Sequence, residues 1–114
     1  MTTIYHNPRC SKSRQTLQLL EENNIQPEIR LYLQDTPSIE EIQTLLTQLN
    51  ITPLELMRTK EAIYKELGLG KDSTDEERLQ AMQANPSLIE RPIVIHNNKA
   101  KIGRPPEDVL ALFE

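Results

Sequence analysis

Residues 2–20 of the chain read TTIYHNPRCSKSRQTLQLL. The first four of these residues predict a short β-strand, and Thr16, Leu17 and Leu20 predict one face of a helix. Cys10 lies between the two elements, where the strand meets the helix. This position favours a thiolate, because the first turn of a helix offers free N–H groups and the positive end of the macrodipole.

The surroundings of Cys10 are cationic although the protein as a whole is acidic. The net charge is −4, yet no Asp or Glu occurs in residues 1–20, and Arg9, Lys12 and Arg14 flank the cysteine. Nearby cations lower the pKa of a thiol. The pattern therefore indicates an anion site built around a nucleophile, whereas the plain alternative is a lone cysteine that packs as a small hydrophobic residue.

The segment after the first helix predicts a second strand. Ile29, Leu31 and Leu33 alternate over residues 28–33, which is the period of a strand. Together with the first strand and helix, this segment completes a β-α-β unit. Such a unit favours a parallel pair of strands joined by a right-handed crossover.

A block of helices is predicted at about residues 38–88. Ser38 and Thr52 each begin a capping box, and Thr74 opens a helix with acids in its first turn. The apolar residues expected on the buried faces of these helices are Ile39, Ile42, Leu45, Leu46, Leu49, Leu54, Met57, Leu67, Leu79 and Met82.

The last part of the chain predicts two strands and a helix. Residues 93–95 are Ile-Val-Ile, and Asn97-Asn98 suits a tight hairpin turn because asparagine tolerates positive φ. Residues 99–102 would form the returning strand. The final helix begins at Pro106, and its expected buried residues are Val109, Leu110 and Phe113. The order β-α-β, helical block, β-β-α predicts an α/β fold with a four-stranded mixed sheet flanked by helices.

A second acid-free stretch, residues 91–106, carries further cations. Arg91 directly precedes the proline that opens a strand, and Arg104 precedes two prolines that fix the backbone. Arg58 ends a short predicted helix. Guanidinium groups match tetrahedral oxyanions bidentately, so we expect the two acid-free stretches to meet at one positive site. The alternative is that each arginine is a solvated surface charge.

Length and composition exclude several classes of protein. A chain of 114 residues suits one domain, and no apolar run reaches the roughly 18–20 residues of a membrane helix. The N-terminal residues lack the apolar core of a signal peptide, and the single cysteine forbids an internal disulfide, so we expect a cytoplasmic protein. The acidic net charge argues against general nucleic-acid binding. One Cys and two His do not complete a usual zinc site, so no metal is expected.

The combination of motifs resembles the ArsC family, the glutaredoxin-coupled arsenate reductases of thioredoxin-like fold. The motifs that carry the resemblance are His6-Asn7-Pro8-x-Cys10, Arg58, Arg91-Pro92-Ile93-Val94 and Gly103-Arg104-Pro105. They occur in the same order as in the family, and the similarity spans residues 4–112. The resemblance implies one thioredoxin-like domain over residues 1–114, with the helical block inserted between the β-α-β and β-β-α parts.

The resemblance also implies roles for individual residues. Cys10 resembles the nucleophile, and His6 resembles the histidine that supports its thiolate. Pro92 matches the cis-proline that thioredoxin-like folds place beside the active loop. Ser13 is a further supporting residue, because small polar residues after the cysteine give a backbone concavity that can bind an oxyanion. The oxyanion-binding residues implied are Arg58, Arg91 and Arg104.

The implied reaction is attack of the thiolate on arsenate or a similar oxyanion. With no second cysteine, glutathione is the implied co-substrate and a glutaredoxin the implied partner, and no bound cofactor is expected. The family usually has a Gly-Thr-Ser type of turn after the cysteine, whereas this chain has Ser11-Lys12-Ser13. Two alternatives stay open. The chain could be a Spx-type regulator that binds RNA polymerase, although the Cys-x-x-Cys switch of that group would need a cysteine at position 13. It could also bind an oxyanion or glutathione without turning over arsenate.

Overall fold

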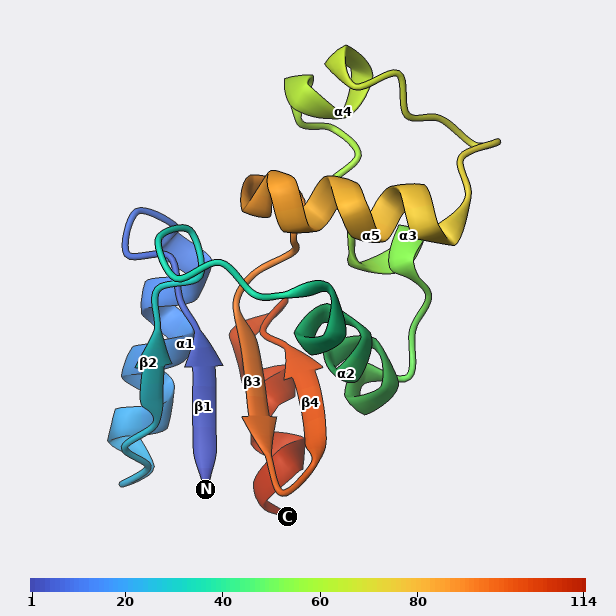
Figure 1. Cartoon of the computed structure of the whole chain (residues 1–114). Coiled ribbons are helices and arrows are strands. Elements are labelled where there is room, and N and C mark those ends of the chain that lie inside the picture. The colour runs from blue at the N-terminus through green and yellow to red at the C-terminus, as the bar shows by residue number, and fades with distance from the viewer. The chain divides into compact units, whose positions relative to one another are not determined.

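The structure, a computed structural model, describes all 114 residues. The chain divides into two compact units: the first comprises Met1–Asp35 and Arg91–Glu114, and the second comprises Thr36–Glu90 (Figure 1). The helices predicted at about residues 38–88 lie in the second unit. The organisation of residues 1–114 as a single domain stays a prediction.

The first unit is built on a mixed sheet of four strands in the order β2-β1-β3-β4. The strands are β1 (Thr2–Tyr5), β2 (Glu28–Arg30), β3 (Ile93–His96) and β4 (Lys99–Ile102). β1 pairs with β2 in parallel through the helix α1 (Ser11–Glu22), and the pairs β1–β3 and β3–β4 are antiparallel. The predicted four-stranded mixed sheet is therefore confirmed.

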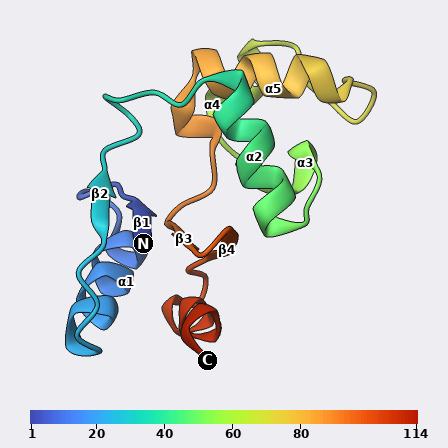
Figure 2. The same cartoon turned by 60° about the horizontal axis from the view of Figure 1, so that its bottom comes forward.

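Two helices cover one face of this sheet: α1 and the C-terminal 3₁₀ helix η2 (Pro106–Phe113) (Figures 1 and 2). The core between them consists of Ile4, Leu20, Val94 and Val109, all fully buried. Val109, Leu110 and Phe113 were expected to be buried. Val109 is fully buried, Leu110 is only partly buried, and Phe113 packs against the core together with Leu112. A 3₁₀ helix has three residues per turn, so Leu112 rather than Leu110 lies above Val109.

The second strand is shorter than the sequence predicts, and its alternating apolar residues are exposed. β2 ends at Arg30, and Ile29, Leu31 and Leu33 are 48%, 37% and 41% exposed. Tyr32 is buried instead, at 1% exposure. The reason is a turn that follows the strand, in which the N–H groups of residues 34 and 35 donate to the Leu31 carbonyl at 2.9 and 2.8 Å. This turn ends the alternation of the strand.

The hairpin between β3 and β4 forms as predicted. Asn97 and Asn98 adopt φ values of 49° and 65°, the left-handed region that a tight two-residue hairpin turn needs. The Arg91–Pro92 peptide bond that leads into β3 is cis, which confirms the expectation drawn from the family resemblance. A second cis bond, Arg104–Pro105, was not predicted.

The second unit is helical. Its elements are α2 (Ile39–Leu49), α3 (Pro53–Leu56), α4 (Ala62–Glu66), α5 (Asp75–Ala84) and the 3₁₀ turn η1 (Pro86–Leu88). The capping boxes at Ser38 and Thr52 are confirmed, and Thr74 forms a third one with Glu77. α5 packs against α2, α3 and η1.

The buried faces of these helices agree with the sequence in part. The confirmed buried residues are Ile42, Leu45, Leu46, Met57, Leu79 and Met82. Ile39 and Leu49 are only partly buried, because they lie at the two ends of α2. Leu54 and Leu67 were predicted to be buried, and this prediction was wrong, since they are 44% and 45% exposed. In α3, Pro53 and Leu56 occupy the inner face three residues apart, so Leu54 faces solvent. None of the helices in the chain combines the length and apolar character needed to cross a membrane.

Arg78 of α5 is an unpredicted buried cation, with 2% exposure. Its Nη1 donates to the Tyr64 hydroxyl at 2.8 Å, and its Nη2 donates to the Gly70 carbonyl at 2.6 Å. The guanidinium also lies 6.0 Å from the centre of the Tyr64 ring. These contacts tie α4 and the segment after it to α5.

Candidate active site

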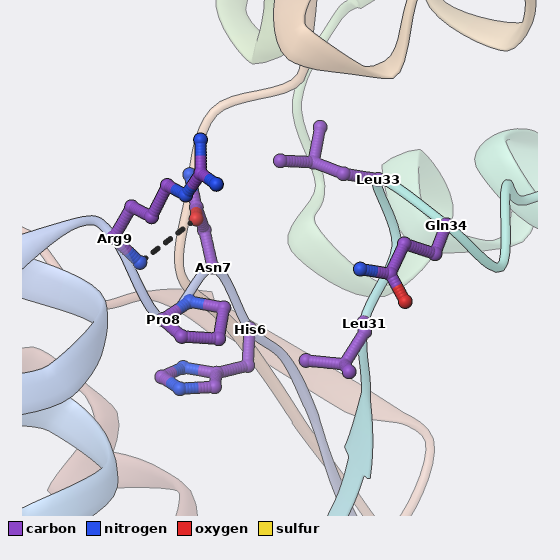
Figure 3. A pocket seen from close by; sticks show the side chains of 7 residues that line it. All are labelled: His6, Asn7, Pro8, Arg9, Leu31, Leu33 and Gln34. Atoms are coloured by element: carbon purple, nitrogen blue, oxygen red, sulfur yellow. Dashed lines mark hydrogen bonds between the residues drawn. The ribbon is translucent and has the colours of Figure 1, made fainter.

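The loop between β1 and α1 holds Cys10 at the N-cap of the helix. The N–H of Cys10 donates to the Asn7 carbonyl at 3.0 Å, and the N–H of Arg9 donates to Asn7 Oδ1 at 3.0 Å (Figure 3). From the helix, Arg14 Nη1 donates to the Pro8 carbonyl at 2.9 Å. The proline ring fixes one dihedral angle of the loop, and these hydrogen bonds fix the rest. These contacts hold the loop at the end of β1 against the first turn of α1.

His6 and Ser13, two of the predicted supporting residues, contact each other beneath this loop. Both are buried, and His6 Nδ1 lies 2.6 Å from Ser13 Oγ, which also accepts the N–H of Asn7 at 3.0 Å. Burial, together with the charge of Arg14, lowers the pKa of His6, so its ring is neutral at pH 7. The contact of His6 is thus with Ser13, and it connects the end of β1 to the first turn of α1.

Two of the predicted arginines meet the thiol. Arg104 Nη2 lies 3.7 Å from Cys10 Sγ and donates to it, while Arg104 Nε donates to the Arg91 carbonyl at 2.8 Å. The Arg91 guanidinium also hydrogen-bonds the sulfur. The two acid-free stretches of the sequence therefore converge at Cys10, as predicted.

The pKa of Cys10 lies below its ordinary value. Burial alone would raise the pKa, because it disfavours the charged sulfur. That effect is outweighed by the backbone N–H of Ser13, the hydrogen bond and charge of Arg91, and the backbone N–H of Lys12. The site thus combines a cysteine of lowered pKa at a helix N-terminus with guanidinium groups that can bind a tetrahedral oxyanion. No group of three or more His, Cys, Asp or Glu side chains is arranged to hold a metal ion.

Arg104 is positioned by the glycine that precedes it. The N–H of Gly103 donates to the Pro92 carbonyl at 2.9 Å. A Cβ atom at Gly103 would lie 2.6 Å from Thr16 Oγ1 and 2.9 Å from Pro92 Cγ, so only glycine allows this approach to α1. Pro92, the predicted cis-proline, therefore lies against the strand end that carries Arg104.

The third predicted arginine, Arg58, belongs to the second unit. Its Nη1 pairs with Glu90 Oε1 at 2.8 Å, and its Nη2 lies 3.7 Å from Glu61 Oε2. Its backbone N–H donates to the Leu88 carbonyl at 2.7 Å, which fixes it beside the segment that leads to residue 91.

Sequence reasoning did not assign roles to Asn7 and Arg14, which hold the loop. The signal for Asn7 was present, because an Asn-Pro pair favours a turn in which the asparagine side chain accepts a nearby backbone N–H. Arg14 had no comparable signal. A cation in the first turn of a helix looks like a component of the positive surface, and only the structure shows that it binds the Pro8 carbonyl.

Comparison with known proteins identifies the family. The model of the ArsC family matches residues 5–112. The chain belongs to the ArsC family. It is 56% identical to the uncharacterized protein YfgD of Escherichia coli K12, over 96% of this chain and 93% of that protein. It is 52% identical to an arsenate reductase of Haemophilus influenzae, over 96% of this chain and 97% of that protein.

A solved structure of a putative arsenate reductase from Yersinia pestis superposes with a TM-score of 0.93 at 54% identity, covering 97% of this chain and 99% of the other. The fold is the thioredoxin-like fold of this family, as predicted.

Proposed function

We propose that this chain is an arsenate reductase in which Cys10 is the nucleophile. The observation that carries the proposal is the thiol at the N-cap of α1, with its pKa lowered and with Arg91 and Arg104 on the sulfur. The names of relatives that match nearly the whole chain support the same activity.

In the first step the Cys10 thiolate attacks the arsenic atom of arsenate. A sulfur–arsenic bond forms, and one arsenate oxygen leaves as water after taking up protons. A thiolate and one negative charge of the oxyanion at 4 Å repel by about 4 kcal/mol at an effective dielectric constant of 20. Arg91 and Arg104 offset this repulsion and hold the oxyanion in line with the sulfur. Arg58 is proposed as a further oxyanion ligand on the strength of the family motif alone.

In the second step external thiols reduce the adduct, because the chain has no other cysteine. Two thiol groups give up two electrons and become a disulfide, arsenic passes from the +5 to the +3 state and leaves as arsenite, and Cys10 is released as a thiol. The sum is arsenate plus two thiols to arsenite, one disulfide and water. We propose glutathione as the first thiol and a glutaredoxin as the protein that clears the disulfide.

His6 and Ser13 are proposed to support the thiolate indirectly. Their contact holds the first turn of α1, whose N–H groups at Lys12 and Ser13 hydrogen-bond the sulfur. A thiol that must be regenerated in every cycle needs a reducing compartment, so we propose that the protein works in the cytoplasm.

The test is arsenite formation by the purified protein with arsenate, glutathione and a glutaredoxin. Cys10→Ser abolishes turnover if the proposal holds, because a hydroxyl cannot form the sulfur adduct. Lys99→Gln, which removes an exposed cation on β4, is the control and leaves the rate unchanged. Wild-type protein that binds arsenate but forms no arsenite would refute the reductase and favour a protein that only binds the oxyanion.

A further inference from the structure

We propose that a small thiol that carries carboxylates binds in a pocket on the β2 side of the thiol loop. The lining of this pocket includes Arg9, Leu31 and Leu33. This inference rests on the proposed function in one respect: it takes the external thiol that the reaction needs to be the occupant. Its test below does not depend on arsenate.

The pocket has a volume of about 320 Å³, at the lower end of the range for small-molecule sites, which is about 300–1,000 Å³. Its apolar lining is Pro8, Leu31 and Leu33, and its polar lining includes Asn7, Arg9 and Gln34. Figure 3 shows Pro8 and Arg9 on one side of the pocket and the two leucines with Gln34 on the other. Leu31 and Leu33 are exposed apolar side chains, and a ligand in the pocket would cover them.

The charge of the pocket selects an anion. The side chain of Arg9 is exposed, and its guanidinium makes no hydrogen bond or ion pair within the chain. The acid nearest in sequence to the opposite wall is Asp35, whose carboxylate is engaged with Arg30 at 3.4 Å. No Asp or Glu occurs in residues 1–20. Arg9 is thus available to bind a carboxylate, to which a guanidinium donates two parallel hydrogen bonds.

The position of the pocket suits the reducing thiol rather than the oxyanion. Arg91 and Arg104 approach Cys10 from the strand β3 and the end of β4, whereas the pocket lies between the loop and the segment after β2. Arg9 directly precedes Cys10, so the pocket lies on the loop that carries the sulfur. The two reactants would therefore meet at Cys10 from different sides of the loop.

The experiment measures how fast thiols react with Cys10 after it has been converted to a mixed disulfide with 2-thiopyridine. An incoming thiolate forms a disulfide with Cys10 and releases 2-thiopyridine, which is followed by absorbance. The probes are glutathione and glutathione diethyl ester, which share the same thiol but differ in their carboxylates. The quantity compared is the ratio of the rate constant for glutathione to that for its diethyl ester. In this ratio, changes in the reactivity of Cys10 itself cancel.

In Arg9→Gln we expect this ratio to fall on the order of three- to tenfold, as a charge-assisted contact is lost. Lys12→Gln removes a cation two residues from Cys10 that does not line the pocket, and Lys99→Gln removes an exposed cation on β4, so both keep the wild-type ratio. A second readout is binding of the unreactive S-methylglutathione. It should shift the methyl NMR signals of Leu31 and Leu33 in the wild type, and much less in Arg9→Gln.

An unchanged ratio in Arg9→Gln would overturn the inference, and so would an equal fall in Lys12→Gln, which would indicate long-range electrostatics. A loss seen only when glutaredoxin is present would also overturn it, in favour of a protein partner on this surface. A protein that shows the expected ratio but forms no arsenite keeps this inference and loses the proposed function.

Discussion

The charge of Arg104 should add to the acidity of Cys10, beside the contributions of Ser13, Arg91 and Lys12. The perturbation is Arg104→Gln, which removes a cation whose Nη2 lies 3.7 Å from the sulfur, together with the Nε donor to the Arg91 carbonyl. The Cys10 pKa should rise, because the thiolate loses a neighbouring positive charge while the thiol loses little.

The magnitude follows from the distance. Two unit charges 3.7 Å apart attract by about 4 kcal/mol at an effective dielectric constant of 20 and by about 1 kcal/mol in water. Cys10 is partly exposed, so the real value lies between these limits, nearer to the aqueous one. At about 1.36 kcal/mol per pKa unit, the pKa should rise by roughly one to two units.

The assay is the rate of alkylation by iodoacetamide as a function of pH, which follows the thiolate fraction. Wild-type protein should react at pH values below the pKa of a free cysteine, about 8.5, and lose reactivity as the pH falls through the lowered pKa. Arg104→Gln should move this loss to higher pH, and Arg104→Lys should move it less because the charge is kept. An inflection in Arg104→Gln that coincides with that of the wild type would refute the reasoning.

Four further predictions concern the same residues and the two units. Arg91→Lys should lower kcat/KM for arsenate by a factor worth about 2–4 kcal/mol, since an ammonium cannot bind an oxyanion bidentately, and full activity would reject the role. Gly103→Ala should destabilise the fold by about 1–3 kcal/mol in urea denaturation, and Thr16→Ala in the same chain should restore part of it by removing the clash. Arg78→Met should lower the free energy of unfolding by about 1–3 kcal/mol, because the buried Tyr64 hydroxyl and the partly buried Gly70 carbonyl lose their donor, and an unchanged midpoint would contradict this. Sulfate should raise the pH at which Cys10 alkylation inflects, whereas an inflection that does not respond to sulfate would contradict an anion site beside the sulfur.

Much of the fold could be predicted because local signals and tertiary packing agree. The strand–cysteine–helix order placed Cys10 at a helix N-cap, and Asn97-Asn98 placed the hairpin turn. The capping boxes at Ser38 and Thr52 depend only on residues three positions apart. Each of these features is decided within one turn of the chain, where one residue type satisfies one backbone group.

The clearest failure is at the end of β2, where the apolar alternation continues into a turn. The alternation at Ile29, Leu31 and Leu33 has the right period for a strand, but a turn at the Leu31 carbonyl ends the strand and turns Tyr32 inward. The apolar alternation alone does not reveal this turn. In the site, the convergence of Arg91 and Arg104 on Cys10 was predictable from the absence of acids. The hydrogen bonds that orient the two guanidinium groups depend on how the strands and the thiol loop lie in space, which the sequence pattern does not give.

The negative charges that would meet at Cys10 exceed the positive charges of the two arginines on the sulfur. A thiolate and a dianionic oxyanion together carry three negative charges, whereas Arg91 and Arg104 supply two positive ones. The backbone N–H groups of Lys12 and Ser13 add only partial positive charge. A bound dianion therefore stabilises the protonated thiol relative to the thiolate, and by linkage a thiolate weakens oxyanion binding. A carboxylate close to the sulfur would increase this repulsion, and residues 1–20 contain no Asp or Glu. In this chain the acid-free N-terminal stretch thus matters as much for holding both reactants at once as for activating the thiol alone.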